Sequence, residues 1–273
     1  MNRRDFLKLA LMSSALLVPA SLPTFAAPAF AAATAPLDTA TVAIPRSLML
    51  HSRHHKQFPD LLDYLMDQGY VGITYDTFYR ALQGEIRLPE KPFLLTIDDL
   101  SMTKGVPSFK VFASMHQALI ERGFKANYAI ITRPDLPQDD DLWAEVKTWG
   151  EDGYGLENHT SYHSNLDNPK WIAEDYRAEI VSSAAEIRHR TGQPVHALIT
   201  PFGSGYDTTT GTLLPMVSAA CKQGDLSFAV GIVGGRTPIQ RPIQQRGVYY
   251  LGRCTMGIDD TNASGIWEVE HWI

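Results

Sequence analysis

The sequence predicts an α/β fold in which parallel strands alternate with helices. Two observations predict it: short apolar runs recur along the chain from Ser47 onward, and longer amphipathic segments separate them. This rhythm is typical of βα units. No charge run, Gly/Ser linker or internal repeat divides it, so a single domain is expected. A barrel and an open sheet are both built from such units, and we favour the barrel.

Each expected strand is a short apolar run, and the first is Ser47-Leu48-Met49-Leu50-His51. In chain order the expected strands are 47–51, 93–97, 126–132, 154–156, 195–200, 227–233 and 248–251.

Helices are expected where apolar residues recur three and four positions apart, and glycine marks the end of three of them. In chain order they are 58–66 ending at Gly69, 112–119 ending before Gly123, a short one at 142–146, and 172–187 ending at Thr191-Gly192.

The first 31 residues predict an export signal. Arg3 and Arg4 precede Phe-Leu-Lys and an apolar run that ends near Val18, which is shorter than the ~20 residues of a membrane-spanning helix. The paired arginines resemble a twin-arginine signal, and Ala29-Phe30-Ala31 offers a cleavage site. We therefore expect an export signal at 1–31, a linker at 32–46 and the domain at 47–273. The mature protein would be periplasmic or extracellular, without a transmembrane span; an uncleaved amphipathic anchor is the alternative.

Composition excludes several classes of protein. Of the 273 residues 44% are hydrophobic and 20% are charged, which is a globular balance unlike that of disordered or collagen-like chains. The formal net charge is −6 and no basic block occurs, so nucleic acid is not an expected partner. Two cysteines, Cys221 and Cys254, cannot build a four-cysteine metal site, and the sequence leaves their pairing open.

Two adjacent carboxylates, Asp98 and Asp99, follow the expected strand 93–97 directly. Active sites gather at the carboxyl ends of parallel strands. Two neighbouring acids cannot both be buried there without a cation or a shared proton, because an unpaired buried charge is strongly unfavourable. A bound metal ion would meet this need. The alternative is that both residues cap the following helix.

Two histidines four positions apart, His159 and His163, are the second candidate. On a helical turn both rings would face the same way, and neutral imidazole is a common zinc ligand. One aspartate oxygen with two imidazole nitrogens would complete a three-ligand site and leave the other aspartate to move protons. Unrelated surface histidines are the alternative. The turn Thr200-Pro201-Phe202-Gly203 could turn a backbone amide toward the same cavity, or could simply end a strand.

These motifs together resemble those of the polysaccharide deacetylases, the NodB-homology group or carbohydrate esterase family 4. Thr96-Ile97-Asp98-Asp99 is similar to the family's Thr-Phe-Asp-Asp motif, and His159–His163 is similar to its His-Ser/Thr-x-x-His motif. Pro201-Phe202-Gly203 is similar to its Pro-Tyr-Gly motif. Their order and spacing match as well, and the resemblance extends from about Leu48 to Arg253.

The resemblance implies a distorted (β/α) barrel of about seven strands with one divalent metal ion, most typically zinc, and a polysaccharide or oligosaccharide substrate. The residues it implies are Asp99, His159 and His163 as metal ligands, Asp98 as catalytic base, and the Phe202 amide, with Pro201 and Gly203, as oxyanion donor and substrate contact.

His51 is the expected proton donor to the leaving group. Leu50-His51 resembles the branch of the family whose amino-terminal strand carries an active-site histidine. An imidazole suits the task because its ordinary pKa, about 6.5, lies near the working pH. His54 and His55 lie on the loop beyond the strand, and His271 lies outside the region of resemblance. A structural His51 that only forms hydrogen bonds is the alternative.

Two positions depart from the family pattern. Leu100 replaces the glycine that usually follows the aspartate pair, so we expect a changed cavity floor or a changed local backbone. Ile199 stands where many members carry an arginine directed at the catalytic aspartate, so Asp98 is expected to lack that partner.

The function expected is metal-dependent removal of N-acetyl groups from a β-linked N-acetylglucosamine-type polysaccharide. Two alternatives stay open. An O-acetyl esterase acting on xylan or a similar polymer could use the same residues, because an ester needs less help to its leaving group. A relative that binds carbohydrate without turnover is suggested by Leu100 and Ile199.

Overall fold

The structure is a computed structural model that describes residues 42, 44–105, 108–207, 209–232, 243–245, 247–256 and 264–272. The predicted export signal, 1–31, and most of the predicted linker, 32–46, lie outside the described residues. Within the described ranges, no helix combines the length and the apolar character needed to cross a membrane.

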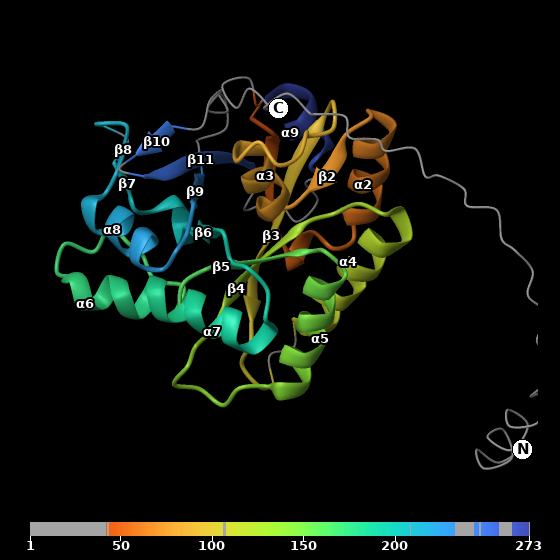
Figure 1. Cartoon of the computed structure of the whole chain (residues 1–273). Coiled ribbons are helices and arrows are strands. Elements are labelled where there is room, and N and C mark those ends of the chain that lie inside the picture. The colour runs from red at the N-terminus through yellow and green to blue at the C-terminus, as the bar shows by residue number, and fades with distance from the viewer. Residues whose placement is uncertain are drawn as a thin grey trace, which may run out of the picture. The chain divides into compact units, whose positions relative to one another are not determined.

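Seven parallel strands close into a barrel (Figure 1). The strands are β1 (Arg46–His51), β3 (Pro92–Ser101), β4 (Asn127–Ile131), β5 (Gly155–Asn158), β6 (Ala197–Ile199), β9 (Phe228–Ile232) and β11 (Val248–Thr255). Neighbours pair in the order β1-β11-β9-β6-β5-β4-β3, and the pairing of β1 with β3 closes the ring. The prediction of a barrel of about seven strands is confirmed, and each expected strand overlaps one of these.

The four expected helices are present on the outside of the barrel. They are α2 (Phe58–Asp67), α4 (Phe109–Arg122), α5 (Asp140–Glu151) and a long helix composed of α6 (Ala173–Tyr176), a π-helical turn (Arg177–Val181) and α7 (Ser182–Thr191). Local sequence sets their ends. Asp139 accepts the N–H of Leu142 at the start of α5, and Gly123 and Gly192 end α4 and α7 with φ of 63° and 70°.

Several short elements were not predicted. They are β2 (Val71–Ile73), α3 (Tyr75–Leu82), β7 (Tyr206–Asp207), β8 (Thr212–Leu213), α8 (Pro215–Gln223), β10 (Ile243–Gln245) and α9 (Ile266–Trp272). The 3₁₀ turns Ser52–His54 and Pro201–Gly203 follow β1 and β6.

The barrel separates two apolar cores. The outer core lies between strands and helices, and it includes Leu95 and Ile97 of β3. The inner core fills the barrel with side chains from the other faces of the strands, such as Leu94 of β3. Tyr75 and Phe78 of α3 belong to this inner core and are fully buried, so α3 packs against the interior of the barrel.

Asn127 joins three elements on one side of β3. The first part of β3 pairs with β2, and β4 pairs with β3 only from Thr96 onward. At this junction the Asn127 side chain accepts the N–H of Tyr75 at 3.0 Å and donates to the carbonyls of Ile73 and Leu95 at 3.2 and 3.1 Å. Asn127 is fully buried. It therefore hydrogen-bonds three main-chain groups at the junction of β2, α3 and β3.

Replacing Asn127 with alanine should lower the free energy of unfolding by about 3 kcal/mol, because each buried polar group left without a partner costs about 1–3 kcal/mol. Urea denaturation measures the change. Asn168→Ala, at an exposed loop position, is the control and should stay within about 0.5 kcal/mol of the wild type. A loss below about 1 kcal/mol for Asn127→Ala would contradict this account of the junction.

His116 on α4 is a buried imidazole in an aromatic cluster. Its ring stacks on Trp149 with centroids 4.3 Å apart, and its Nδ1 lies 2.8 Å from the Tyr128 hydroxyl. Burial lowers the pKa of His116 to about 4. The folded protein therefore holds this ring neutral under conditions where the unfolded chain, with a pKa of about 6.5, takes up a proton.

The resulting stability should depend on pH. The contribution of neutral His116 is complete above about pH 6.5 and is lost as the pH falls through about 4, because protons then bind preferentially to the unfolded chain. Between about pH 7 and 4.5, the unfolding free energy of the wild type should fall by about 1–2 kcal/mol relative to that of His116→Phe. Urea denaturation at a series of pH values gives this difference, and parallel profiles for the two proteins would contradict it.

Candidate active site

A β-bulge in β3 places two adjacent carboxylates at one rim of the barrel. The register between β3 and β4 shifts between Ile97 and Leu100, and Asp99 has a φ of 72°. Side chains alternate between the faces of a regular strand, and a bulge adds one residue to that alternation. Asp98 therefore points inward and Leu100 returns to the outer core, with Asp99 as the extra residue between them. The alternative that both aspartates cap the next helix is wrong, because the N-cap of α4 is Ser108.

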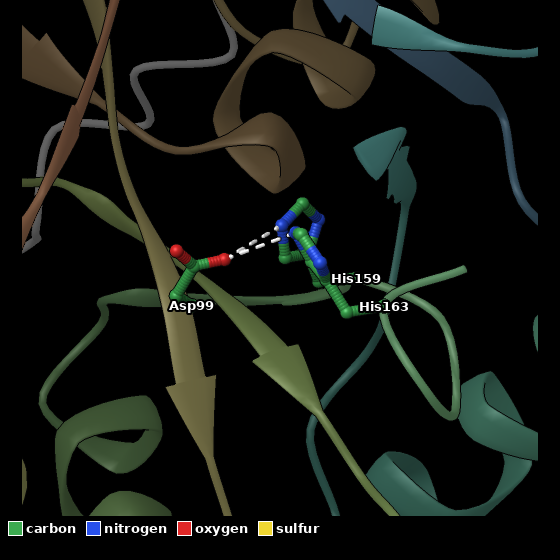
Figure 2. A group of neighbouring side chains, drawn as sticks. All are labelled: Asp99, His159 and His163. Carbon is green, nitrogen blue, oxygen red and sulfur yellow. Dashed lines mark ion pairs between the residues drawn. The ribbon is translucent and has the colours of Figure 1, made fainter. Parts of the chain in front are cut away.

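Asp99 lies against two imidazoles (Figure 2). Its Oδ1 is 3.3 Å from Nε2 of His159 and 3.2 Å from Nε2 of His163. These three ligand atoms lie within 4.8 Å of one another. The fold therefore brings together the three side chains that the sequence analysis selected as metal ligands.

His159 is oriented by its second ring nitrogen. The residue is buried at the end of β5, and its Nδ1 lies 2.7 Å from the carbonyl oxygen of Ile199. A carbonyl only accepts, so Nδ1 carries the hydrogen in this contact and Nε2 faces Asp99. A donor bond of this kind fixes the ring of a metal-ligating histidine and selects the nitrogen that binds.

The segment from His159 to His163 is a loop, which corrects the expectation of a helical turn. Thr160 and His163 have positive φ values of 66° and 58°, which an α-helix does not contain. Neighbouring side chains hold the loop. Asn158 accepts the N–H of Thr160, and the Glu179 carboxylate accepts the N–H of Tyr162 and the hydroxyl of Ser164.

The Asp99 carboxylate is suited to a divalent cation. Burial raises the pKa of Asp99, but the imidazoles of His159 and His163 outweigh that effect and hold its pKa well below its usual range. Its Oδ1 is buried and makes no aligned hydrogen bond with the described part of the chain. Two ligands of a tetrahedral zinc ion lie about 3.3–3.4 Å apart, close to the two separations seen here. The residues present therefore fit a zinc-type ion.

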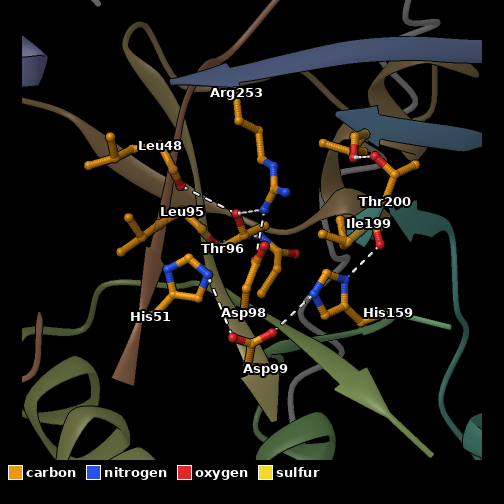
Figure 3. Close-up of polar contacts among 12 residues, drawn as sticks. Leu48, His51, Leu95, Thr96, Asp98, Asp99, His159, Ile199, Thr200 and Arg253 are labelled. Atoms are coloured by element: carbon orange, nitrogen blue, oxygen red, sulfur yellow. Dashed lines mark hydrogen bonds and ion pairs between the residues drawn. The ribbon is translucent and has the colours of Figure 1, made fainter. Parts of the chain in front are cut away.

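Asp98 is buried in an ion pair with Arg253 of β11 (Figure 3). Nη1 of Arg253 lies 2.8 Å from Oδ1 of Asp98 and 2.5 Å from the Thr96 hydroxyl. The Thr96 hydroxyl donates in turn to the carbonyl of Leu48. The Asp98 side chain is 2% exposed and that of Arg253 is fully buried.

His51 ends β1 directly beside Asp98, its partner in the β1–β3 register. Its Nε2 lies 3.6 Å from Oδ2 of Asp99, on the other side of that carboxylate from His159 (Figure 3). Burial lowers the pKa of His51, and the charges of Asp98 and Asp99 oppose this shift without cancelling it. His54 is fully buried and its Nδ1 accepts the N–H of His51, so it supports the end of the strand.

Phe202 lies at the rim in the turn that follows β6. The residue is 66% exposed, and the centroid of its ring lies 4.6 Å from that of the His163 ring. Phe202 has a φ of 59°, which is unfavourable for an aromatic residue, and Gly203 follows with 68°. Pro201 is buried at the start of the turn.

A sequence profile of the polysaccharide deacetylase family matches residues 85–215. This part of the chain is similar to the polysaccharide deacetylase family. A comparison of the sequence with curated proteins finds no match. The matched residues contain the aspartate pair, both histidines and the Phe202 turn, whereas His51 and Arg253 lie outside them.

Several solved structures share the fold of this chain. Streptococcus pyogenes deacetylase PplD, in complex with acetate, has a TM-score of 0.59 at 18% identity, covering 79% of this chain and 92% of that one. IcaB from Ammonifex degensii has a TM-score of 0.58 at 18% identity, covering 82% and 96%. A de-N-acetylase from Aggregatibacter actinomycetemcomitans has a TM-score of 0.57 at 17% identity, covering 80% and 95%. At these identities the likeness shows the fold.

The structure explains what happens at the two positions, Leu100 and Ile199, where the sequence departs from the family pattern. Leu100 packs into the outer core after the bulge, so it does not form the cavity floor. Ile199 is apolar and lies in the inner core, as the sequence indicates. Asp98 therefore lacks an arginine partner at position 199, as expected, but Arg253 reaches it from β11 instead. Sequence reasoning missed Arg253 because no local motif marks it.

Cys221 and Cys254 are both buried and are not joined by a disulfide. The sequence left open whether these two cysteines pair, and in this fold they do not.

Proposed function

We propose that this protein is a metal-dependent hydrolase that removes N-acetyl groups from a β-linked N-acetylglucosamine-type polysaccharide. The observation that carries the proposal is the convergence of Asp99, His159 and His163 beside the buried carboxylate of Asp98. A ligand set with an adjacent base is the arrangement that hydrolysis of an acetamide requires. The family assignment supports the same chemistry.

Asp99, His159 and His163 would hold one divalent ion, with zinc preferred for a site of two nitrogens and one oxygen. When bound, such an ion polarises the acetyl carbonyl and lowers the pKa of a water molecule to about 7.

Asp98 would act as the base. Arg253 engages its Oδ1, which leaves Oδ2 to accept a proton from the attacking water. The water oxygen then bonds to the acetyl carbon, and the carbonyl oxygen gains negative charge. The N–H of Phe202 would donate a hydrogen bond to this oxyanion, and one such preorganised donor contributes about 3 kcal/mol in comparable sites. Pro201 and Gly203 hold the turn that presents this amide.

His51 would complete the reaction by protonating the sugar nitrogen as the carbon–nitrogen bond breaks, which releases acetate and a free amine. Its place at the end of β1, next to Asp98 and near Asp99, supports this role. The need for such a donor favours N-deacetylation over ester hydrolysis, because an amine is the poorer leaving group.

The paired arginines of the amino-terminal segment support export to the periplasm or cell exterior, where such polymers lie.

Ligand and base variants should separate metal binding from turnover. His159→Ala and His163→Ala should each weaken zinc affinity by more than about 100-fold, since each removes a direct ligand. Asp98→Asn should keep one zinc per chain and lose at least about 100-fold in kcat, the contribution of a general base. Metal analysis after dialysis and acetate release from poly-N-acetylglucosamine give the two readouts.

His189→Ala, on the exposed face of α7, is the matched histidine control and should change neither readout. The non-catalytic alternative would be established by two results together. The metal-loaded wild type would bind glycans without releasing acetate, and Asp98→Asn would behave in the same way.

His51→Ala should affect amides more than esters. We expect N-deacetylation to fall by about 100-fold or more and hydrolysis of acetylated xylan or a small activated acetyl ester to fall by less than about tenfold. Parallel kinetics on the two substrate types measure the difference. Equal losses on both would remove His51 as leaving-group donor, and wild-type acetate release from xylan alone would make the protein an O-acetyl esterase.

A further inference from the structure

The last barrel strand contributes a charged side chain to the interior at the level of the candidate base. Arg253 leaves β11 with its side chain fully buried, and its Nη1 contacts both Oδ1 of Asp98 and the hydroxyl of Thr96. We propose that Arg253 is a positioning residue that sets the orientation of the Asp98 carboxylate for proton transfer. This inference rests on the proposed role of Asp98 as base.

The contacts fix one oxygen of the carboxylate and leave the other available. Thr96 lies two residues before Asp98 on the inward face of β3, and its hydroxyl is anchored to the carbonyl of Leu48 on β1. Nη1 of Arg253 is thus held between Thr96 and Asp98, with its carbon chain rooted in β11. A planar guanidinium with donors in a fixed fork constrains the direction of an acceptor in a way that a flexible ammonium does not. Three strands therefore define where Oδ1 lies.

Stability alone does not account for this pair. Exchanging a buried ion pair for apolar side chains is often neutral or stabilising, and apolar residues such as Ile199, Val230 and Leu251 already pack inside the barrel. Nη2 of Arg253 is buried and finds no hydrogen-bond partner in the described part of the chain, so even the arginine is incompletely satisfied. A charge in such a setting is better explained by the carboxylate it orients.

If Arg253 acts by orienting Asp98, a guanidinium supplied from another strand should be able to replace it. Position 199 on β6 also lies in the inner core, so an arginine there would enter the barrel from a different strand than Arg253 does. Moving the guanidinium from position 253 to position 199 therefore tests whether orientation of Asp98 is what matters.

The kinetic experiment uses zinc-loaded full-length protein and both an N-acetylated oligosaccharide and a small acetyl ester. Arg253→Met should lower kcat by about 100-fold or more, with KM within about threefold and zinc content unchanged. Arg253→Lys keeps the charge without the fork and should still lose at least about tenfold in kcat. Wild-type kcat in either variant would overturn the proposal, as would a loss of kcat that only follows a loss of zinc.

The matched control is Arg188→Met. Arg188 donates three hydrogen bonds to the main-chain carbonyls of Val195, Gly224 and Asp225, remote from the aspartate pair in sequence and contacts. It should lower the thermal denaturation midpoint and leave kcat within about twofold, which separates a structural arginine from a positioning one. The double variant Ile199→Arg/Arg253→Met should recover at least about tenfold of the kcat lost in Arg253→Met. No recovery in a folded, zinc-loaded double variant would count against orientation as the cause.

Crystal structures of the wild type and Arg253→Lys provide a readout that does not depend on turnover, and the lysine variant serves if Arg253→Met does not fold. We expect the Asp98 carboxylate to rotate away from its place beside Thr96. An unchanged carboxylate would overturn the positioning role. Wild-type protein inactive on every acetylated substrate would instead refute the proposed function, and the crystallographic comparison would still decide whether Arg253 orients Asp98.

Discussion

Closure of the barrel by the pairing of β1 with β3 is the constraint on which the site depends. Residues Arg46–His51 pair with Phe93–Asp98 in continuous parallel register, and β1 pairs on its other side with β11. The ring brings the carboxyl ends of all seven strands to one rim, so His51, Asp99 and His159 meet although the chain between them is long. In an open sheet β1 and β11 could lie at opposite edges, and neither could complete a site centred on β3.

The backbone at this rim is held in conformations that most of the chain avoids. Within the described ranges, six non-glycine residues have a positive φ, and four of them, Asp99, Thr160, His163 and Phe202, belong to the site. Such conformations each cost about 1–3 kcal/mol and persist only where surrounding contacts determine them. Asn158 and Glu179 supply those contacts for the histidine loop. The surrounding contacts thus hold the histidine loop in a conformation that the backbone alone would not favour.

Sequence reasoning predicted the regular parts of the fold and the side chains with distinctive chemistry. The seven strands, the outer helices and the meeting of Asp99 with both histidines follow from apolar runs, helical spacing and motifs. β2 is only three residues long, too short for a periodic signal, and α3 was missed with it. The loop form of residues 159–163 depends on Asn158 and Glu179, which carry no recognisable spacing. Arg253 sits within an ordinary strand sequence, and its pairing with Asp98 appears only once strand order and register bring the two side chains together.

The bulge in β3 limits which mutations this segment can tolerate. The extra residue of the bulge places two neighbouring carboxylates at the same rim of the barrel. The arrangement of Asp98 and Asp99 therefore depends on the number of residues between Thr96 and Met102 as well as on their identity. Loss of one position would restore strict alternation and leave a single acid at the rim. Gain of one would turn Leu100 and Met102 from the outer core toward the polar mouth of the barrel. Over evolutionary time this stretch should therefore exchange side chains far more readily than it changes length.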